Sequence, residues 1–265
     1  MPFVDVHTHL THERFAADLP QVVARARAAG VTRIVTNGTD GPDNRRVLEL
    51  AATYPEVLPA LGIYPVDAIA NEILAGGHEL PWDQRPVDAD TELAFIDAHA
   101  GDAVAIGECG LDAYWVADYM ARQREVFGAL IEIARAHNRP LIVHSRGAEV
   151  ETLAFLRERG ATRVDFHCFG GRFNLAREVC AAGYHCSIPA NIAKNQLFQK
   201  MARELPLDRL LTETDAPYLA PERGTRNEPA NIPATVTAIA ELRGMAVADV
   251  EHAIEENFHR LFQRD

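Results

Sequence analysis

Short apolar runs alternate with amphipathic stretches from one end of the chain to the other. The runs are rich in Val, Ile and Leu, which predicts buried strands. Eight of them are predicted as strands: Val4–His7, Arg33–Asn37, Val57–Gly62, Ala103–Glu108, Leu141–His144, Arg163–His167, Tyr184–Ser187 and Leu210–Glu213. The stretches with helical spacing are predicted as helices: Asp18–Ala29, Arg45–Tyr54, Asp118–His137, Ala148–Arg159, Phe173–Ala182, Ala230–Arg243 and Asp249–Phe262.

The order of these elements predicts the architecture. A strand, a helix and the next strand, repeated, give parallel pairing through right-handed crossovers. Eight such units within 265 residues match the size of a (β/α)8 TIM barrel, which needs about 250 residues. We therefore expect one domain spanning residues 1–265, closed by the last two helices. Gly30, Gly160 and Gly183 follow predicted helices and are expected to end them.

One stretch departs from the alternation. Residues Ala70–Asp90 contain a Gly-Gly pair and two prolines, which predicts an irregular insertion after the third strand. Its tryptophan, Trp82, is expected to anchor a surface loop.

Charge and cysteine content narrow the class of protein. With 38 acidic and 26 basic residues the net charge is −12, which argues against a broad basic face that coats nucleic acid. All basic residues except Lys194 and Lys200 are arginines, so a phosphate contact would come from a guanidinium. The four cysteines form no C-x-x-C pair and are expected to be reduced. No apolar leader or membrane-length apolar run occurs, so we expect a cytoplasmic protein without a membrane partner.

Polar side chains stand where several predicted strands end. His7 and His9 lie at the end of the first strand, and strand periodicity puts both imidazoles on one side, as half of a metal site. The others are Glu108, His144 and His167, at the ends of the fourth, fifth and sixth strands, and Asp215, just after the eighth. Each of these residues alone has a simple explanation, because polar residues are common where a strand reaches solvent. Because the carboxyl ends of all strands meet at one face of a TIM barrel, together they favour a metal site.

This set predicts two divalent ions, because it exceeds what one tetrahedral ion needs. The ligand types suit zinc, manganese or magnesium. Glu108 is the expected bridge, since a carboxylate can join two ions about 3.5–4 Å apart. Asp215 is expected both to bind an ion and to accept the proton of the attacking water, which makes Asp215 and Glu108 the candidate catalytic residues. The remaining histidines are expected to be structural or exposed: His12, His78, His99, His137, His185, His252 and His259.

Several blocks of the sequence resemble those of the TatD family of metal-dependent hydrolases, many of which are described as deoxyribonucleases. The blocks are FVDVHTHL (3–10), IGECGLD (106–112), PLIVHSR (140–146), HCF (167–169), LTETDAPYLA (211–220) and RNEP (226–229). The resemblance implies a TIM barrel with two metal ions. It also implies one ion held by His7, His9 and Asp215, another held by His144 and His167, and a bridge formed by Glu108.

One block departs from the family pattern, which has a histidine where this chain has Tyr64 in the segment Gly62–Asp67. Tyrosine can donate a hydrogen bond but is not a cation at neutral pH, so the difference concerns the substrate more than the metals. The segment Ser187–Asn191 also departs, at the substrate rim. Tyr64, Arg146 and Arg226 are the candidate substrate-binding residues.

Further rim residues are candidates with simpler alternatives. Arg172 and Arg223 could contact phosphate or be surface arginines. Four aromatic residues could stack on a base or pack the rim: Tyr114, Trp115, Phe169 and Tyr218. Glu213, two residues before Asp215, is a candidate acceptor that orients a histidine.

Three functions remain open from the sequence. The first is a phosphodiesterase of the deoxyribonuclease type, in which a metal-bound water attacks phosphorus and nucleic acid is a transient partner. The second is an amidohydrolase-like carbonyl hydrolase of an amide, lactone or aminoacyl ester. The third is a metal-binding barrel without activity, which the complete ligand set disfavours. A glutamate rather than a carboxylated lysine at the bridging position favours the first. Both a monomer and a small homo-oligomer are compatible with the sequence.

Overall fold

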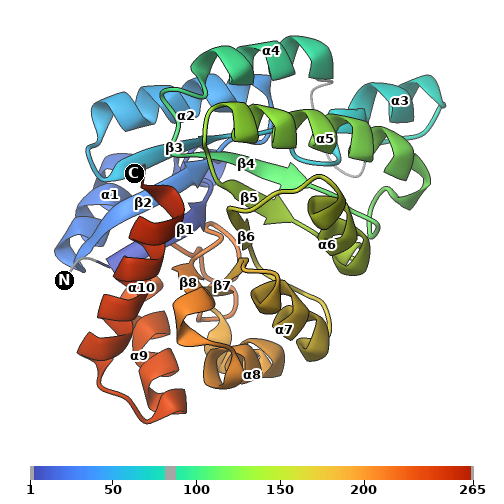
Figure 1. Cartoon of the computed structure of the whole chain (residues 1–265). Helices are drawn as coiled ribbons and strands as arrows, with labels where there is room; N and C mark the ends of the chain where they lie inside the picture. Colours follow the sequence, from blue (N-terminus) through green and yellow to red (C-terminus); the bar gives the residue numbers. More distant parts are fainter. Residues whose placement is uncertain (1–2, 81–87, 264–265) are drawn as a thin grey trace.

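Eight parallel strands form a nearly closed barrel in the computed structural model, which describes residues 3–80 and 88–263 (Figure 1). The strands pair in chain order. Their bounds are β1 Phe3–Thr8, β2 Val31–Asn37, β3 Val57–Leu61, β4 Ala105–Gly110, β5 Leu141–His144, β6 Val164–Phe166, β7 His185–Pro189 and β8 Leu210–Glu213. The predicted TIM barrel is therefore confirmed, and every predicted strand end lies within two residues of the observed one.

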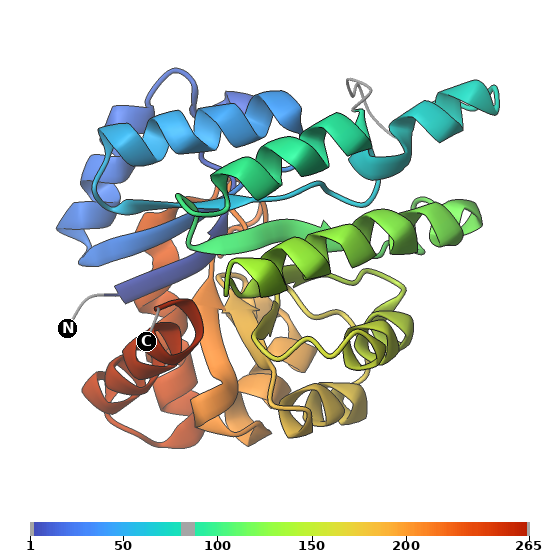
Figure 2. The ribbon, with the colours of Figure 1, turned by 45° about the horizontal axis from the view of Figure 1, so that its top comes forward.

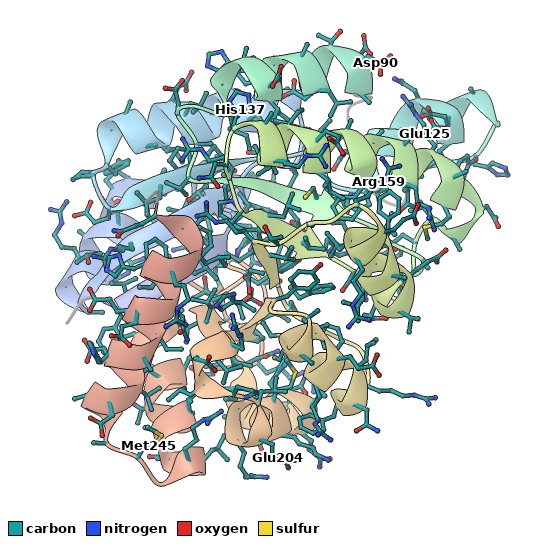
Figure 3. All side chains as sticks on the ribbon, in the orientation of Figure 1. Asp90, Glu125, His137, Arg159, Glu204 and Met245 are labelled. Carbon is teal, nitrogen blue, oxygen red and sulfur yellow. The ribbon has the colours of Figure 1, made fainter. Side chains whose placement is uncertain are left out.

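The helices surround the barrel. Their bounds are α1 Leu19–Ala28, α2 Gly41–Thr53, α3 Ala70–Ala75, α4 Ala89–His99, α5 Met120–Ala136, α6 Glu149–Glu158, α7 Phe173–Ala181, α8 Gln196–Glu204, α9 Ile232–Arg243 and α10 Val247–Phe262. Figure 2 shows α4 and α5 side by side along one flank. Charged side chains lie on the outside of the helix layer: Glu125 of α5 and Glu204 of α8 are exposed and point away from the barrel (Figure 3). Within residues 3–80 and 88–263, no helix has the length and hydropathy of a membrane span.

All seven predicted helices are present, but three helices of the described residues were not predicted. These are α4, α8 and α3, and α3 occupies the first residues of the segment that was predicted to be irregular. α2 begins at Gly41, before the predicted start, because the Asp40 carboxylate accepts a hydrogen bond from the Asp43 amide at 2.8 Å and caps the helix. Trp82 lies outside the described residues.

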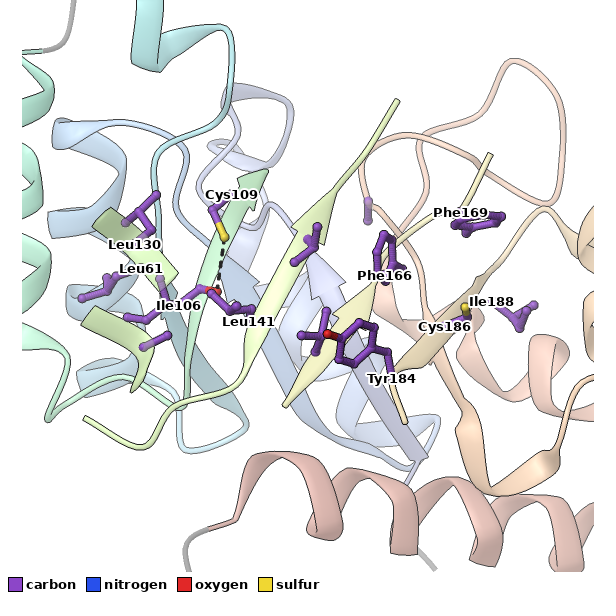
Figure 4. Packing of buried hydrophobic residues seen from close by; sticks show 14 of the residues in the cluster. Leu61, Ile106, Cys109, Leu130, Leu141, Phe166, Phe169, Tyr184, Cys186 and Ile188 are labelled. Carbon is purple, nitrogen blue, oxygen red and sulfur yellow. Dashed lines mark hydrogen bonds between the residues drawn. The ribbon is translucent and has the colours of Figure 1, made fainter. Parts of the chain in front are cut away.

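Buried apolar side chains pack in two clusters. The larger lies between the strands and the helices and includes Ile106, Leu130 and Phe166 (Figure 4). The smaller joins one or two side chains from each of six strands with three from α10, so α10 packs onto the strands at the barrel interior. All four cysteines are free, as expected.

The barrel closes between β1 and β8 through side chains as well as backbone. The Thr212 hydroxyl donates to the Val4 carbonyl at 2.6 Å. The buried Asp5 carboxylate accepts hydrogen bonds from the Thr214 amide at 2.9 Å and the Thr214 hydroxyl at 2.6 Å. Burial raises the pKa of Asp5 to about 7, against the effect of these hydrogen bonds. This seam sets the histidines of β1 beside the residues that follow β8.

We expect Thr214→Val to weaken the seam, because the buried Asp5 carboxylate loses its hydroxyl donor while the side-chain volume is kept. A hydrogen bond to a charged group contributes about 1.5–3 kcal/mol, and the free energy of unfolding should fall by about that amount. Urea denaturation at pH 8, above the pKa of Asp5, measures it. Thr53→Val is the matched control, because its exposed hydroxyl donates to a helix carbonyl. Equal effects of the two substitutions would contradict the role of the seam.

Candidate metal centre

One group of ligand atoms converges on the Oε2 atom of Glu108. His7 Nε2 and His9 Nε2 each lie 3.5 Å from this oxygen. Asp215 Oδ1 lies 3.6 Å from His7 Nε2 and 3.5 Å from His9 Nε2. The two imidazole nitrogens are 3.1 Å apart. Two strand-end histidines and two carboxylates thus offer four ligand atoms to one small space.

A second group converges on the other carboxylate oxygen, Oε1. His144 Nδ1 and His167 Nε2 each lie 3.0 Å from it, and 3.4 Å separates these two nitrogens. The groups also touch through their rings, because His7 stacks on His167 with centroids 3.8 Å apart and planes at 8°. Glu108 therefore faces a different pair of imidazoles with each of its oxygens, which is the arrangement of a bridging carboxylate.

The spacing of these atoms fits divalent ions. Ligands of a tetrahedral ion at about 2.0–2.1 Å are separated by about 3.3–3.4 Å, and those of an octahedral ion by about 3.0 Å. The distances within both groups span 3.0–3.6 Å. Imidazole and carboxylate are the donors that zinc and manganese accept. The structure brings all six predicted ligands together, and it does so around the residue expected to bridge.

Glycine allows the backbone of Glu108 to reach this position. A Cβ atom at Gly62, just after β3, would lie 2.3 Å from the Glu108 carbonyl oxygen, and one at Gly107 would lie 2.7 Å from the Ile142 Cβ. No larger residue fits at either place without moving a strand. The two glycines therefore allow β4 to pack closely against the segment after β3 and against β5.

Two of the histidines are oriented through their second ring nitrogen. His9 Nδ1 lies 3.3 Å from the Asn37 carbonyl oxygen, which leaves Nε2 for an ion. His144 Nε2 lies 2.9 Å from Asp112 Oδ2, which leaves Nδ1. Asp112 was not predicted as a site residue. The available signal was its position four residues after Glu108, at the end of the block IGECGLD.

The charges of the site balance each other. Burial alone would raise the pKa of Glu108, but the neighbouring imidazoles of His167, His144 and His7 outweigh burial and hold it well below its usual range. The same balance raises the pKa of His144 to about 9, because contacts with Asp112 and Glu108 outweigh desolvation. His9 also has a pKa of about 9, from Asp215 and Glu108 against burial. The metal-free centre thus holds positive charge on histidines, in the place where cations would bind.

His7 differs from its neighbours in charge. Burial, and then the nearby His167, lower its pKa to about 4. A neutral imidazole is the form that can donate an electron pair to a metal. His7 is therefore already in its ligating form at neutral pH.

The predicted substrate residues lie in three different settings. The Tyr64 hydroxyl is 3.4 Å from Asp112 Oδ2 and 3.5 Å from His144 Nε2, beside the second group. Arg146 is exposed, with its guanidinium 4.0 Å above the Tyr114 ring. Arg226 donates to both oxygens of Asp18, at 2.6 and 2.7 Å, and so fastens the loop after β8 to the segment after β1. Their roles toward substrate stay predictions.

Glu213 and two further histidines make contacts that stabilise the fold. Glu213 accepts hydrogen bonds from the Cys168 amide at 2.9 Å and the Ser187 hydroxyl at 2.6 Å, and its Oε2 is 3.8 Å from His167 Nδ1, too far for a hydrogen bond. The expectation that Glu213 orients a histidine directly therefore lacks the contact it needs. His137 pairs with Asp97, and His12 caps a short helix, as expected for structural histidines.

Comparison with known proteins places the chain among similar sequences along its whole length. The model of the TatD related DNase family matches residues 4–263. The chain is 35% identical over 269 residues to human deoxyribonuclease TATDN3, covering 98% of this chain and 94% of that protein. It is 36% identical over 265 residues to YabD of Bacillus subtilis, named an uncharacterized metal-dependent hydrolase, covering 98% of each. The crystal structure of the TatD homologue YJJV of Escherichia coli K12 superposes with a TM-score of 0.85 at 26% identity, covering 99% of this chain and 98% of that one.

We expect Asp112→Asn to weaken divalent-ion binding at the His144 group, because the imidazole loses the charge that orients it. Loss of such a partner typically lowers metal affinity by roughly 10- to 100-fold. Competition with a chromogenic chelator, with zinc as the probe, measures the change. Asp97→Asn is the matched control, since Asp97 makes the same kind of contact, at 2.8 Å, with the surface residue His137. An unchanged affinity in Asp112→Asn would show that Asp112 does not act on the centre.

Proposed function

The chain belongs to the TatD related DNase family, and we propose that it is a phosphodiesterase that cleaves DNA with two divalent ions held around Glu108. The observation that carries the proposal is the pair of ligand groups that share the two oxygens of this one buried carboxylate. The deoxyribonuclease name of the human relative supports DNA as the substrate. The named metal-dependent hydrolase of Bacillus subtilis supports the need for metal.

Six side chains would hold the ions. His7, His9 and Asp215 would bind one, His144 and His167 the other, and Glu108 both. When bound, such a pair of ions lowers the pKa of water and neutralises the charge that develops on a phosphodiester. The side chains of His7, Glu108, His144 and His167 are buried, so the protein excludes most water from the place where the ions would bind. Charges act more strongly on a substrate in such a region than in water.

Asp215 is suited to accept a proton. Burial raises its pKa, but the contact with His9 and the neighbouring imidazoles of the site outweigh burial, so the pKa of Asp215 is lowered and the carboxylate is ionised at neutral pH. Its amide donates to the His7 carbonyl at 2.9 Å, which holds the residue over the ligand pair. Asp215 would take the proton of the attacking water, as a general base in direct reach of the reacting group.

Arg146 is the residue suited to hold the substrate phosphate. It is exposed, and the ion pairs of the described residues do not include it, so its guanidinium is available to an anion. Tyr64 would donate a hydrogen bond at the rim, in place of the family histidine. With a net charge of −12 we expect transient binding through a few local contacts. The four free cysteines support the inferred cytoplasmic location.

The amidohydrolase-like alternative is weaker. A carboxylated lysine cannot form the bridge, because the bridging position holds Glu108 and the chain has no lysine before Lys194. The ligand spacing alone fits attack on carbon as well as on phosphorus. A substrate assay must therefore include both a phosphodiester and a carboxyl ester.

We expect Asp215→Asn to keep the fold and lose most of the turnover, because amide retains the size of the carboxylate but cannot take a proton. Loss of a general base typically costs about 10²–10⁴ in rate. Metal-loaded parent and variant are assayed on single-stranded DNA, a generic phosphodiester and a carboxyl ester, with a chelator-treated parent as the metal-free reference. The parent should cleave both phosphodiesters, and chelation should abolish this activity.

Asp208→Asn serves as the matched control, since Asp208 is largely exposed beside Arg209 and should keep the parent rate. Melting temperatures of all three proteins separate a loss of chemistry from a loss of folding. Turnover of the carboxyl ester alone would overturn the proposed function. A rate close to that of the parent in Asp215→Asn would overturn the role of Asp215.

A further inference from the structure

Three aromatic side chains are exposed around the metal centre. In residues 3–80 and 88–263 the exposed large apolar residues include Tyr114 at 61%, Trp115 at 44% and Tyr218 at 48%, and no other aromatic residue. Tyr114 and Trp115 follow β4, which carries Glu108, and Tyr218 follows Asp215. Exposed aromatic rings therefore gather where ligand-bearing strands end, although burying them elsewhere would stabilise the fold.

The backbone of the Tyr114–Trp115 pair is fastened to the metal centre. Asp112 Oδ1 accepts hydrogen bonds from the Tyr114 amide at 2.8 Å and the Trp115 amide at 2.7 Å, while its Oδ2 contacts His144. The buried Gln123 side chain accepts from the Asp112 amide at 2.7 Å and donates to the Val116 carbonyl at 2.9 Å. The loop is thus held at both ends, and a rigid loop costs little conformational entropy when a ligand binds.

Arg146 joins this pair from the next strand end. Its Cζ atom lies 4.0 Å from the centroid of the Tyr114 ring and 5.6 Å from that of Trp115, and the two rings meet edge to face at 4.8 Å. The Ala113 amide donates to the Arg146 carbonyl at 3.0 Å, which ties the two loops together. A guanidinium beside an aromatic surface offers one anion contact and one stacking contact to the same ligand.

We propose that Tyr114, Trp115 and Arg146 form a subsite for the nucleotide next to the cleaved bond, with its base stacked on the aromatic pair and its phosphate bound by Arg146. This inference rests on the proposed phosphodiesterase function and states which part of the substrate the enzyme would recognise. A nucleotide is the ligand that combines a planar base with an anion one sugar away. Because stacking on a side chain needs an accessible base face, the subsite takes an unpaired base rather than one inside a duplex.

The test compares a single-stranded oligothymidine with a strand of the same length that has abasic sugars. Each base stacked on an aromatic side chain typically changes affinity by roughly 5- to 150-fold, so kcat/KM of the metal-loaded parent should be higher for oligothymidine by a factor in that range. Trp115→Ala should lose most of this preference, because kcat/KM falls much more on oligothymidine than on the abasic strand. Trp115→Phe, which keeps a ring, should retain much of it, and Met245→Ala, an exposed residue before α10, should behave as the parent.

A binding measurement separates this inference from the proposed function. The chain has two tryptophans, so Trp82→Phe leaves Trp115 as the only indole, and its fluorescence reports stacking without turnover. Phosphorothioate oligothymidine should quench this fluorescence and its abasic counterpart should not. Cleavage of both strands at equal rates, with no quenching, would overturn the subsite and leave the phosphodiesterase intact. Quenching by oligothymidine without any cleavage would overturn the phosphodiesterase and leave the subsite.

Discussion

The centre depends on one constraint: the buried carboxylate of Glu108 needs imidazole partners at both of its oxygens. At 3% exposure it has lost its water, which is costly for an ion unless partners replace the water. His7 and His9 face one oxygen, and His144 and His167 face the other. Divalent ions between these nitrogens and oxygens would meet the same need more strongly, which is why a buried glutamate at this place indicates a metal-binding protein.

The barrel is built so that this meeting occurs. The candidate ligands come from five strand ends spread over the whole chain, and closure between β1 and β8 brings His7 and His9 to Asp215. Asp5, two residues before His7 on β1, joins the two strands, because its buried carboxylate accepts hydrogen bonds from both the amide and the hydroxyl of Thr214. Gly62 and Gly107 let β4 lie deep enough for Glu108 to reach both groups. Fold and site therefore depend on the same few contacts.

Sequence reasoning reached the barrel and the six side chains that converge at its mouth, because both leave local signals. Apolar runs mark strands, and the C-terminal end of each strand has a known place in a barrel, so His144 and His167 could be joined to His7 without coordinates. Asp112 and Asp5 were missed because their roles depend on partners far along the chain, His144 and Thr214, which no spacing reveals. The pairing of Arg226 with Asp18 was also missed, because the two residues lie far apart in the sequence, and the role of Arg226 toward substrate stays a prediction. α4 and α8 were missed although Asp88 and Asn195, whose side chains cap them, are residues that favour helix N-termini.

Whether Glu108 bridges two ions can be measured by anomalous X-ray scattering from crystals loaded with manganese. We expect two anomalous peaks about 3.5–4 Å apart, one near His7, His9 and Asp215 and the other near His144 and His167, with one Glu108 oxygen directed to each. A single peak at saturating manganese, or two peaks with Glu108 turned away from either, would contradict it.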